Sequence, residues 1–250
     1  MNKNKNNMLI VSLCIAAGVF GAYAAPHSHK KHSHSAPKSI IDNQASIKNT
    51  VYAFDLHNVV FSLSKKGVIR VLSGAPGKLK LLWLVASPSF WDHYHATKKL
   101  ADSTESRILL LSQKYPELLR YKQTFFDLCN QQIINSDVVD IIKQLKNKDA
   151  TLVVASNIGE FTYQDLTKKY PELNTLFDFA FTTGEISDYT KKPDPRFFKN
   201  LTRQVHKRFP QTKSIVFIDD KEKNTEAALY TGLNAILFES AQDLAQKLRI

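Results

Sequence analysis

The stretch YAFDLHNVV, residues 52–60, places an aspartate at the end of a short apolar run and a histidine two residues later. Such a run ending in polar residues is typical of a central strand in a parallel sheet, because both faces of that strand are buried. ATLVVASN at 150–157 and SIVFIDD at 214–220 follow the same plan. Two further strands are expected at 177–184 and 234–240.

Amphipathic segments typical of helices alternate with these strands. They cover residues 136–148, 161–173, 194–209 and 221–233, and Gly232 is expected to end the last of them. Strict alternation of strand and helix predicts an α/β fold, a doubly wound (Rossmann-like) parallel sheet. A ligand of such a sheet binds at the carboxyl ends of the strands.

The alternation stops between Val60 and Asn135, where the sequence is mostly helical. We therefore expect an α/β core at 49–61 and 136–250, interrupted by a small helical cap domain at 62–135. The alternative is that this block, with its apolar LKLLWLVA segment, belongs to the same core.

The N-terminal region has the composition of an export signal. Two lysines, an apolar stretch and the pattern Ala22-Tyr23-Ala24 predict a signal peptide at 1–24, although an uncleaved anchor has nearly the same length. Residues 25–48 begin with a His-rich segment and are expected to be a disordered leader that binds metal or only separates signal and domain. The predicted location is the periplasm or the medium, with no membrane attachment after cleavage.

The overall composition excludes several classes of protein. With 43% hydrophobic and 23% charged residues, the chain is neither disordered nor a multi-span membrane protein. Its formal net charge of +11 becomes +9 once cleavage removes Lys3 and Lys5. This balance suits anionic partners without selecting one. We expect a small phosphorylated substrate rather than a nucleic acid, and the sequence leaves the oligomeric state open.

Polar residues at the strand ends form the candidate site. If the sheet is parallel, Asp55, Ser156, Asp219 and Asp220 converge on one crevice, and Lys192 joins them from the preceding loop. A nucleophilic carboxylate, a hydroxyl, an ammonium group and a carboxylate pair suit phosphoryl transfer with Mg²⁺. Taken singly, each residue also fits a structural role in a turn, a helix cap or a solvated pair.

The segments FDLHNVV, ASN, KKPDP and FIDDKEKN, in this order, resemble the four motifs of the haloacid dehalogenase superfamily of hydrolases. The resemblance covers roughly residues 50 to 240 and also implies the helical cap between the first and second motifs. It implies that Asp55 is the nucleophile and that Lys192 neutralises charge. It further implies phosphate binding by Ser156 and the backbone N–H of Asn157.

For Mg²⁺, the resemblance implies a site made of Asp55, the backbone carbonyl of His57, Asp219 and Asp220. Asp220 would bind the ion directly, and Asp219 would either bind it directly or support the direct ligands. Asn224 would order the neighbouring loop. His57 departs from the family pattern, because phosphatases of this family usually carry a second aspartate there as the acid and base.

Three interpretations of His57 follow. The imidazole replaces the missing acid and base, it is a spectator, or it marks a degenerate site kept for binding. We therefore expect an exported Mg²⁺-dependent phosphatase that acts on a small phosphate monoester through an aspartyl phosphate. The alternatives are a catalytically degenerate binding protein and a hydrolase of the dehalogenase type.

Overall fold

The computed structural model describes residues 44–97, 104–129 and 131–250. The expected signal peptide and residues 25–43 of the expected leader lie outside this part of the chain. The described residues form two compact units, one made of Leu63–Ile133 and the other of the chain up to Ser62 together with Ile134–Ile250. Within the described residues, no helix is both long and apolar enough to cross a bilayer.

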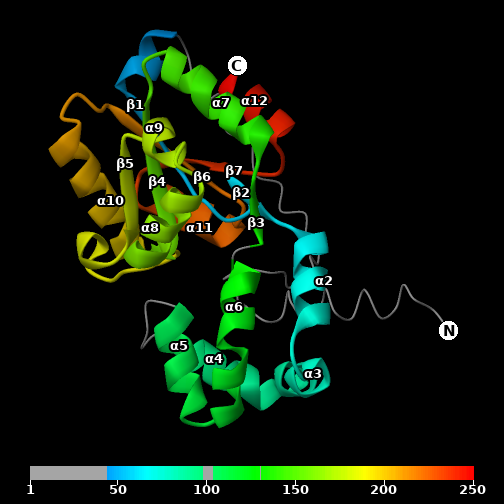
Figure 1. Cartoon of the computed structure of the whole chain (residues 1–250). Coiled ribbons are helices and arrows are strands. Elements are labelled where there is room, and N and C mark those ends of the chain that lie inside the picture. Colours follow the sequence, from blue (N-terminus) through cyan, green and yellow to red (C-terminus); the bar gives the residue numbers. More distant parts are fainter. Residues whose placement is uncertain (1–43, 98–103, 130) are drawn as a thin grey trace, which may run out of the picture. The chain divides into compact units, whose positions relative to one another are not determined.

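A five-stranded sheet organises the larger unit (Figure 1). In the order β5-β4-β1-β6-β7, every pair of neighbouring strands is parallel, which confirms the expected doubly wound α/β sheet. The strands are β1 (Thr50–Phe54), β4 (Thr151–Gly159), β5 (Phe179–Thr183), β6 (Ser214–Asp219) and β7 (Asn234–Leu237).

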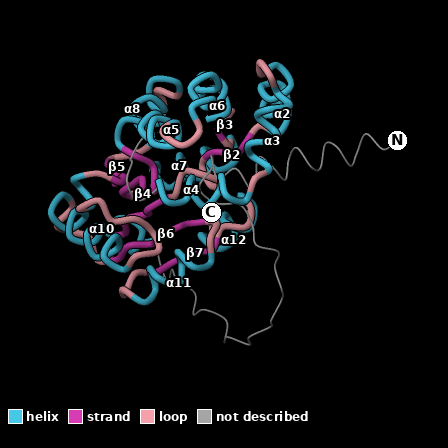
Figure 2. Tube along the Cα trace, turned by 90° about the horizontal axis from the view of Figure 1, so that it is seen from below, coloured by secondary structure: helices cyan, strands magenta, loops and turns pink. Residues whose placement is uncertain are grey.

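Both faces of this sheet are covered by helices. Along β1, Tyr52 and Phe54 point into one apolar cluster, whereas Val51 and Ala53 point into another. The helices are α7 (Ser136–Asn147), α8 (Glu160–Lys169), α9 (Leu173–Leu176), α10 (Pro195–Arg208), α11 (Glu222–Tyr230) and α12 (Ala241–Leu248). Helices α10 and α11 pack on one face, and α7, α8 and α12 on the other (Figure 2). The short helix α9 packs on the same face as α7, through Leu173 and Leu176. This two-sided burial explains why the strands read as continuous apolar runs.

Two expected boundaries are wrong. The leader was expected to extend to residue 48, but Gln44–Asn49 forms a 3-10 helix, η1, and its Ile47 is buried in the core. A single apolar residue among polar ones gives no periodic signal. The helix expected at 161–173 ends at Lys169, because Pro171 follows Tyr170 and a residue before proline avoids the helical region. By contrast, α11 ends as expected, with Gly232 at a φ of 88°.

The smaller unit is helical. It contains α2 (Lys65–Gly74), α3 (Lys78–Ala86), α4 (Pro88–Thr97), α5 (Thr104–Ser112), the 3-10 helix η2 (Pro116–Tyr121) and α6 (Lys122–Cys129). Phe90, Leu118 and Tyr121 are almost fully buried in its own apolar cluster. Phe90 therefore belongs to the apolar core between the helices of this unit. The short strands β2 (Phe61–Leu63) and β3 (Gln132–Ile134) form a separate two-stranded sheet where the chain passes between the units.

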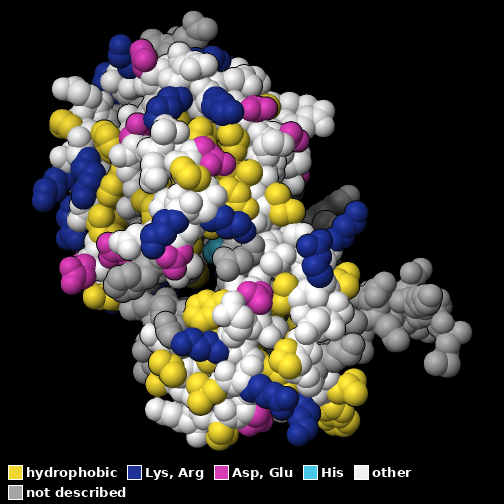
Figure 3. Space-filling view, in the orientation of Figure 1, with side chains coloured by type: hydrophobic (Ala, Val, Ile, Leu, Met, Phe, Trp, Pro, Cys, Tyr) yellow, Lys and Arg dark blue, Asp and Glu magenta, His cyan; other side chains and the backbone are white. Residues whose placement is uncertain are grey.

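One exposed face of helix α10 is rich in basic side chains. Lys and Arg side chains gather along α10, at the left edge of Figure 3. The exposed basic side chains of this helix are Arg196, Lys199, Arg203, Lys207 and Arg208. They lie opposite the buried face of α10, so they affect solubility and long-range attraction of anions rather than the core.

Candidate active site

The carboxyl ends of β1, β4 and β6 bring the predicted site residues together. Phe54 of β1 pairs in register with Val154 of β4 and with Ile218 of β6. The next residue on β1, Asp55, donates its backbone N–H to the carbonyl of Ile218 at 2.8 Å. Asp55 therefore lies level with Asp219, the last residue of β6.

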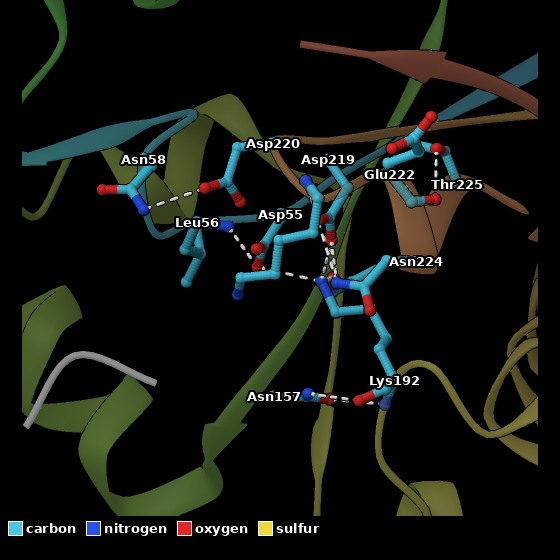
Figure 4. A network of polar contacts seen from close by, with 12 residues as sticks. Asp55, Leu56, Asn58, Asn157, Lys192, Asp219, Asp220, Glu222, Asn224 and Thr225 are labelled. Atoms are coloured by element: carbon cyan, nitrogen blue, oxygen red, sulfur yellow. Dashed lines mark hydrogen bonds and ion pairs between the residues drawn. The ribbon is translucent and has the colours of Figure 1, made fainter. Parts of the chain in front are cut away.

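Lys192 lies between these two carboxylates (Figure 4). Its Nζ is 3.0 Å from Asp55 Oδ1 and 2.6 Å from Asp219 Oδ2, and it also donates to the carbonyl of Ala155 at 2.8 Å. All three charged side chains are almost completely buried. Buried charges are stable in a protein only when they are paired and hydrogen-bonded, as they are here.

The charges in this cluster set one another's protonation. Burial raises the pKa of Asp55, but the positive charges of Lys192, Lys221 and His57, together with the Ser156 hydroxyl, outweigh burial, so the pKa is lowered. Burial lowers the pKa of Lys192, but Asp55 and Asp219 reverse the effect and raise it. Asp55 is therefore a carboxylate and Lys192 an ammonium group at neutral pH. A carboxylate of this kind has the charge that a nucleophile requires.

Asp219 is the most heavily hydrogen-bonded carboxylate of the site. Its Oδ1 accepts from the backbone N–H of Lys221 at 2.9 Å, and Asn224 Nδ2 donates to both of its oxygens at 2.9 and 3.0 Å. Burial raises the pKa of Asp219, which Lys192 opposes and Asp55 reinforces. The helix-capping interpretation of Asp219 is wrong, since Lys221 is the N-cap of α11.

Asn157 and Ser156 follow each other near the end of β4. Asn157 holds the backbone of Lys192 at two points: its Oδ1 accepts from the Lys192 N–H at 2.7 Å, and its Nδ2 donates to the Lys192 carbonyl at 2.9 Å. The resemblance implied a role for the backbone N–H of Asn157, so this side-chain role was missed. Ser156 Oγ is fully buried and has no partner at hydrogen-bond geometry within the described chain, although it lies close enough to Asp55 to help lower the pKa of that carboxyl.

Asp220 completes a possible cation site. Asp55, Asp219 and Asp220 each offer one oxygen, and these atoms all lie within 4.8 Å of one another. Asn58 Nδ2 donates to Asp220 Oδ2 at 2.9 Å, whereas Asp220 Oδ1 is buried and has no partner among the described residues. An orphaned buried acceptor costs about 1–3 kcal/mol. A hard cation would remove this cost, because carboxylate oxygens are its preferred ligands.

Two residues near the site were missed by the sequence analysis. Asn58 has a φ of 62°, in the left-handed region that asparagine tolerates better than most residues. Its contact with Asp220 joins positions that are 162 residues apart in the chain. The charge of Lys221 acts on Asp55 and Asp219. Neither residue follows from the pattern of strands and helices.

His57 lies in the loop that leaves β1. It is half-buried, and its backbone forms an isolated bridge with Phe61. Its charge contributes to the lowered pKa of Asp55, after the larger effects of burial and of the two lysines. His57 is therefore within electrostatic reach of Asp55, while its role as acid, base or spectator stays a prediction.

Comparison with known proteins identifies the family of the chain. The sequence profile of the family described as "Haloacid dehalogenase-like hydrolase" matches residues 93–238, more than half of the chain. The matched segment includes Ser156, Lys192, Asp219 and Asp220, and it begins after Asp55. No curated protein matches the chain.

Solved structures share the fold. A HAD family enzyme from Bacteroides thetaiotaomicron has a TM-score of 0.59 at 18% identity, covering 82% of this chain and 100% of that chain. That enzyme was also solved in complex with magnesium and inorganic phosphate, with a TM-score of 0.55 at 17% identity and coverage of 78% and 98%.

Two other proteins are similar to a comparable degree. A "predicted HAD-like family hydrolase" from Porphyromonas gingivalis has a TM-score of 0.58 at 21% identity, covering 81% of this chain and 98% of that one. A dehalogenase has a TM-score of 0.56 at 14% identity, with coverage of 78% and 95%. At such identities the structural likeness concerns the fold, whereas the profile match identifies the family. The chain belongs to the family of haloacid dehalogenase-like hydrolases.

Proposed function

We propose that the protein is a Mg²⁺-dependent phosphatase that hydrolyses a small phosphate monoester through an aspartyl phosphate at Asp55. The observation that carries this proposal is the pairing of an ionised, buried Asp55 with Lys192 beside two orphaned buried atoms, Asp220 Oδ1 and Ser156 Oγ. The orphaned carboxylate oxygen suits a cation, and the orphaned hydroxyl can donate to a phosphate oxygen.

The residues support the first half of the reaction as follows. Asp55 Oδ1 accepts from the Leu56 N–H at 2.8 Å and faces Lys192, so we assign Oδ2 as the oxygen that attacks phosphorus. The bond from phosphorus to the alcohol oxygen breaks as the new Asp55–phosphorus bond forms. Lys192 and the Ser156 hydroxyl offset charge on the phosphoryl oxygens. Bound Mg²⁺, held by Asp55, Asp219 and Asp220, would supply Lewis-acid stabilisation of the same oxygens.

His57 takes the place of the aspartate that usually acts as acid and base. In the proposal, its imidazolium gives a proton to the leaving alcohol oxygen, and the neutral imidazole then removes a proton from the water that attacks the phosphoryl group. Phosphate leaves, and Asp55 returns to a carboxylate. An imidazole suits both steps, because its unperturbed pKa of about 6.5 lies near neutrality.

Phosphate release from a panel of small esters, including p-nitrophenyl phosphate, tests the proposal. Wild-type protein should turn over with MgCl₂ and stop with EDTA, and the isosteric Asp55→Asn variant should be inactive. His57→Ala should lower the rate by about 10² to 10⁴, while His57→Asp, which restores the usual residue, should lower it less. Turnover that persists in Asp55→Asn would contradict the mechanism.

The second candidate is a dehalogenase-type hydrolase. The observation that favours it is His57 itself, because a branch without the second aspartate uses its first aspartate to displace halide. Halide displacement needs no metal, so it would not provide a ligand for the buried, unpartnered Oδ1 of Asp220. Halide release from a 2-haloacid in the presence of EDTA would favour this candidate. A folded protein that binds Mg²⁺ but turns over no ester and no haloacid would instead indicate a binding protein.

We also propose that the protein is exported to the periplasm or the medium after cleavage behind Ala24. The support is the N-terminal lysines, apolar stretch and small-residue site. Cell fractionation followed by N-terminal sequencing should find a mature chain that begins at Ala25. A chain that keeps Met1 and stays with the membrane would favour the uncleaved anchor.

A further inference from the structure

The loop after β1 is closed by the backbone around Asn58. The Phe61 N–H donates to the Leu56 carbonyl at 2.8 Å, and the Asn58 N–H donates to the Phe61 carbonyl at 2.6 Å. Asn58 adopts a φ of 62° within this closed loop. Asparagine tolerates the left-handed region better than most residues, and unlike glycine it carries a side-chain amide that can act outside the turn.

The side-chain amide of Asn58 contacts Asp220. Asn58 Nδ2 donates to Asp220 Oδ2 at 2.9 Å, as the dashed line in Figure 4 shows. The other oxygen, Oδ1, is buried without a partner among the described residues. One oxygen of the carboxylate is thus held by a neutral donor, and the other is left for a ligand.

From this asymmetry we infer that Asn58 is a positioning residue that orients Asp220 as a one-oxygen metal ligand through Oδ1. The inference rests on the proposed function, since it takes the cluster of Asp55, Asp219 and Asp220 as the cation site. An uncharged amide fixes the carboxylate without neutralising it, so the full charge remains for the cation. Groups that orient a metal ligand in this way typically contribute 10–100-fold to metal affinity.

Asn58 also joins the first and last motifs of the site. Asp220 directly follows β6, whereas Asn58 belongs to the loop that follows β1. Holding these two loops together keeps Asp220 near Asp55 before any cation arrives. The expected benefit is preorganisation, because less side-chain freedom is lost when the ion binds.

Two substitutions separate the amide from the backbone conformation. Asn58→Gly removes the amide and keeps the left-handed conformation at no steric cost, whereas Asn58→Ala removes the amide and adds strain. Binding of Mn²⁺, followed by the electron paramagnetic resonance signal of the free ion and competed with MgCl₂, measures affinity without any turnover. Thermal melting monitored by circular dichroism verifies that each variant is folded.

We expect Asn58→Gly to weaken Mn²⁺ and Mg²⁺ binding by 10–100-fold while its melting temperature without metal stays near that of the wild type. In an Asp220→Asn background, the same substitution should change affinity less than twofold, because Asn58 acts through that carboxylate. Wild-type binding with an Asn58→Gly affinity within twofold of it would overturn the inference. Absence of binding in the folded wild type would instead overturn the metal part of the proposed function.

Discussion

Replacing Lys192 with methionine should destabilise the protein strongly at neutral pH. The side chain of Lys192 is 1% exposed, and those of its partners Asp55 and Asp219 are 4% and 0% exposed. Methionine keeps most of the volume but leaves two buried carboxylates without their ammonium partner. Removing one member of a buried ion pair costs about 3–5 kcal/mol. We expect a loss of this size in the free energy of unfolding at pH 7 with EDTA.

The pH dependence identifies the cause of this loss. In the wild type, the lowered pKa of Asp55 gives stability that is present above about pH 3.8 and is lost as the pH falls through the lowered folded-state pKa. The raised pKa of Lys192 gives stability that is present below about pH 10.5 and is lost as the pH rises through the raised folded-state pKa. In Lys192→Met the unpaired carboxylates can take up protons on acidification. The difference between the two proteins should therefore shrink both from pH 7 towards pH 4 and above pH 10.5.

Denaturant titration at pH 4, 7 and 11 measures these differences. Lys199→Met is the matched control, because Lys199 is exposed on α10 and its loss should change stability by less than about 0.5 kcal/mol. A second substitution, Asp55→Asn, should restore part of the stability of Lys192→Met. Saturating MgCl₂ should do so as well, since a ligand of the folded state stabilises it. A loss below about 1 kcal/mol that does not vary with pH would refute the reasoning.

Three further substitutions test individual contacts. Tyr52→Phe should raise the free energy of unfolding by about 1 kcal/mol at pH 7, because the Tyr52 hydroxyl is buried without a partner in the described chain. Burial raises the pKa of Tyr52 to about 12, so the unfolded tyrosine ionises at a lower pH than the folded one. Between pH 10 and pH 12 the free energy of unfolding of the wild type should therefore fall by up to about 2.7 kcal/mol more than that of Tyr52→Phe. Denaturant titrations that show the same alkaline loss in both proteins would contradict this. Asn157→Ala should cost about 1–3 kcal/mol in denaturant titration and lower phosphate release, because two hydrogen bonds to the Lys192 backbone disappear, and unchanged turnover would contradict it. Asn224→Ala should lower the free energy of unfolding by about 2 kcal/mol in the same titration, because Asp219 loses a donor to both of its oxygens. The control Lys223→Ala, on the exposed face of the same helix, should lower it by less than about 0.5 kcal/mol.

The sheet and the convergence of the site follow from the sequence for a simple reason. Parallel strands buried on both faces are continuous apolar runs, and their carboxyl ends meet at one edge of the sheet. Asp55 and Asp219 could therefore be placed together although they are far apart in the chain. Lys192 could be added because the KKPDP segment directly precedes a recognisable helix.

The remaining contacts depend on geometry that no local pattern contains. Asn58 reaches Asp220 from a backbone with a positive φ, and nothing in DLHNVV indicates the partner. The two hydrogen bonds between the Asn157 side chain and the Lys192 backbone depend on the path of the loop that contains Lys192. The strands β2 and β3 are three residues each, too short for a periodic signal. Ile47 is likewise a single apolar residue whose burial depends on the tertiary fold.

The most direct test of the central claim is to trap the aspartyl phosphate. Protein mixed with p-nitrophenyl phosphate and MgCl₂ is quenched in acid within one turnover and reduced with borohydride. A first hydride expels phosphate from the acyl carbon and a second reduces the resulting aldehyde, so a phosphorylated aspartate becomes homoserine. Peptide mass spectrometry should then find homoserine at position 55, only when both the ester and Mg²⁺ were present. Turnover of the ester with position 55 unmodified in every quenched sample would contradict the account.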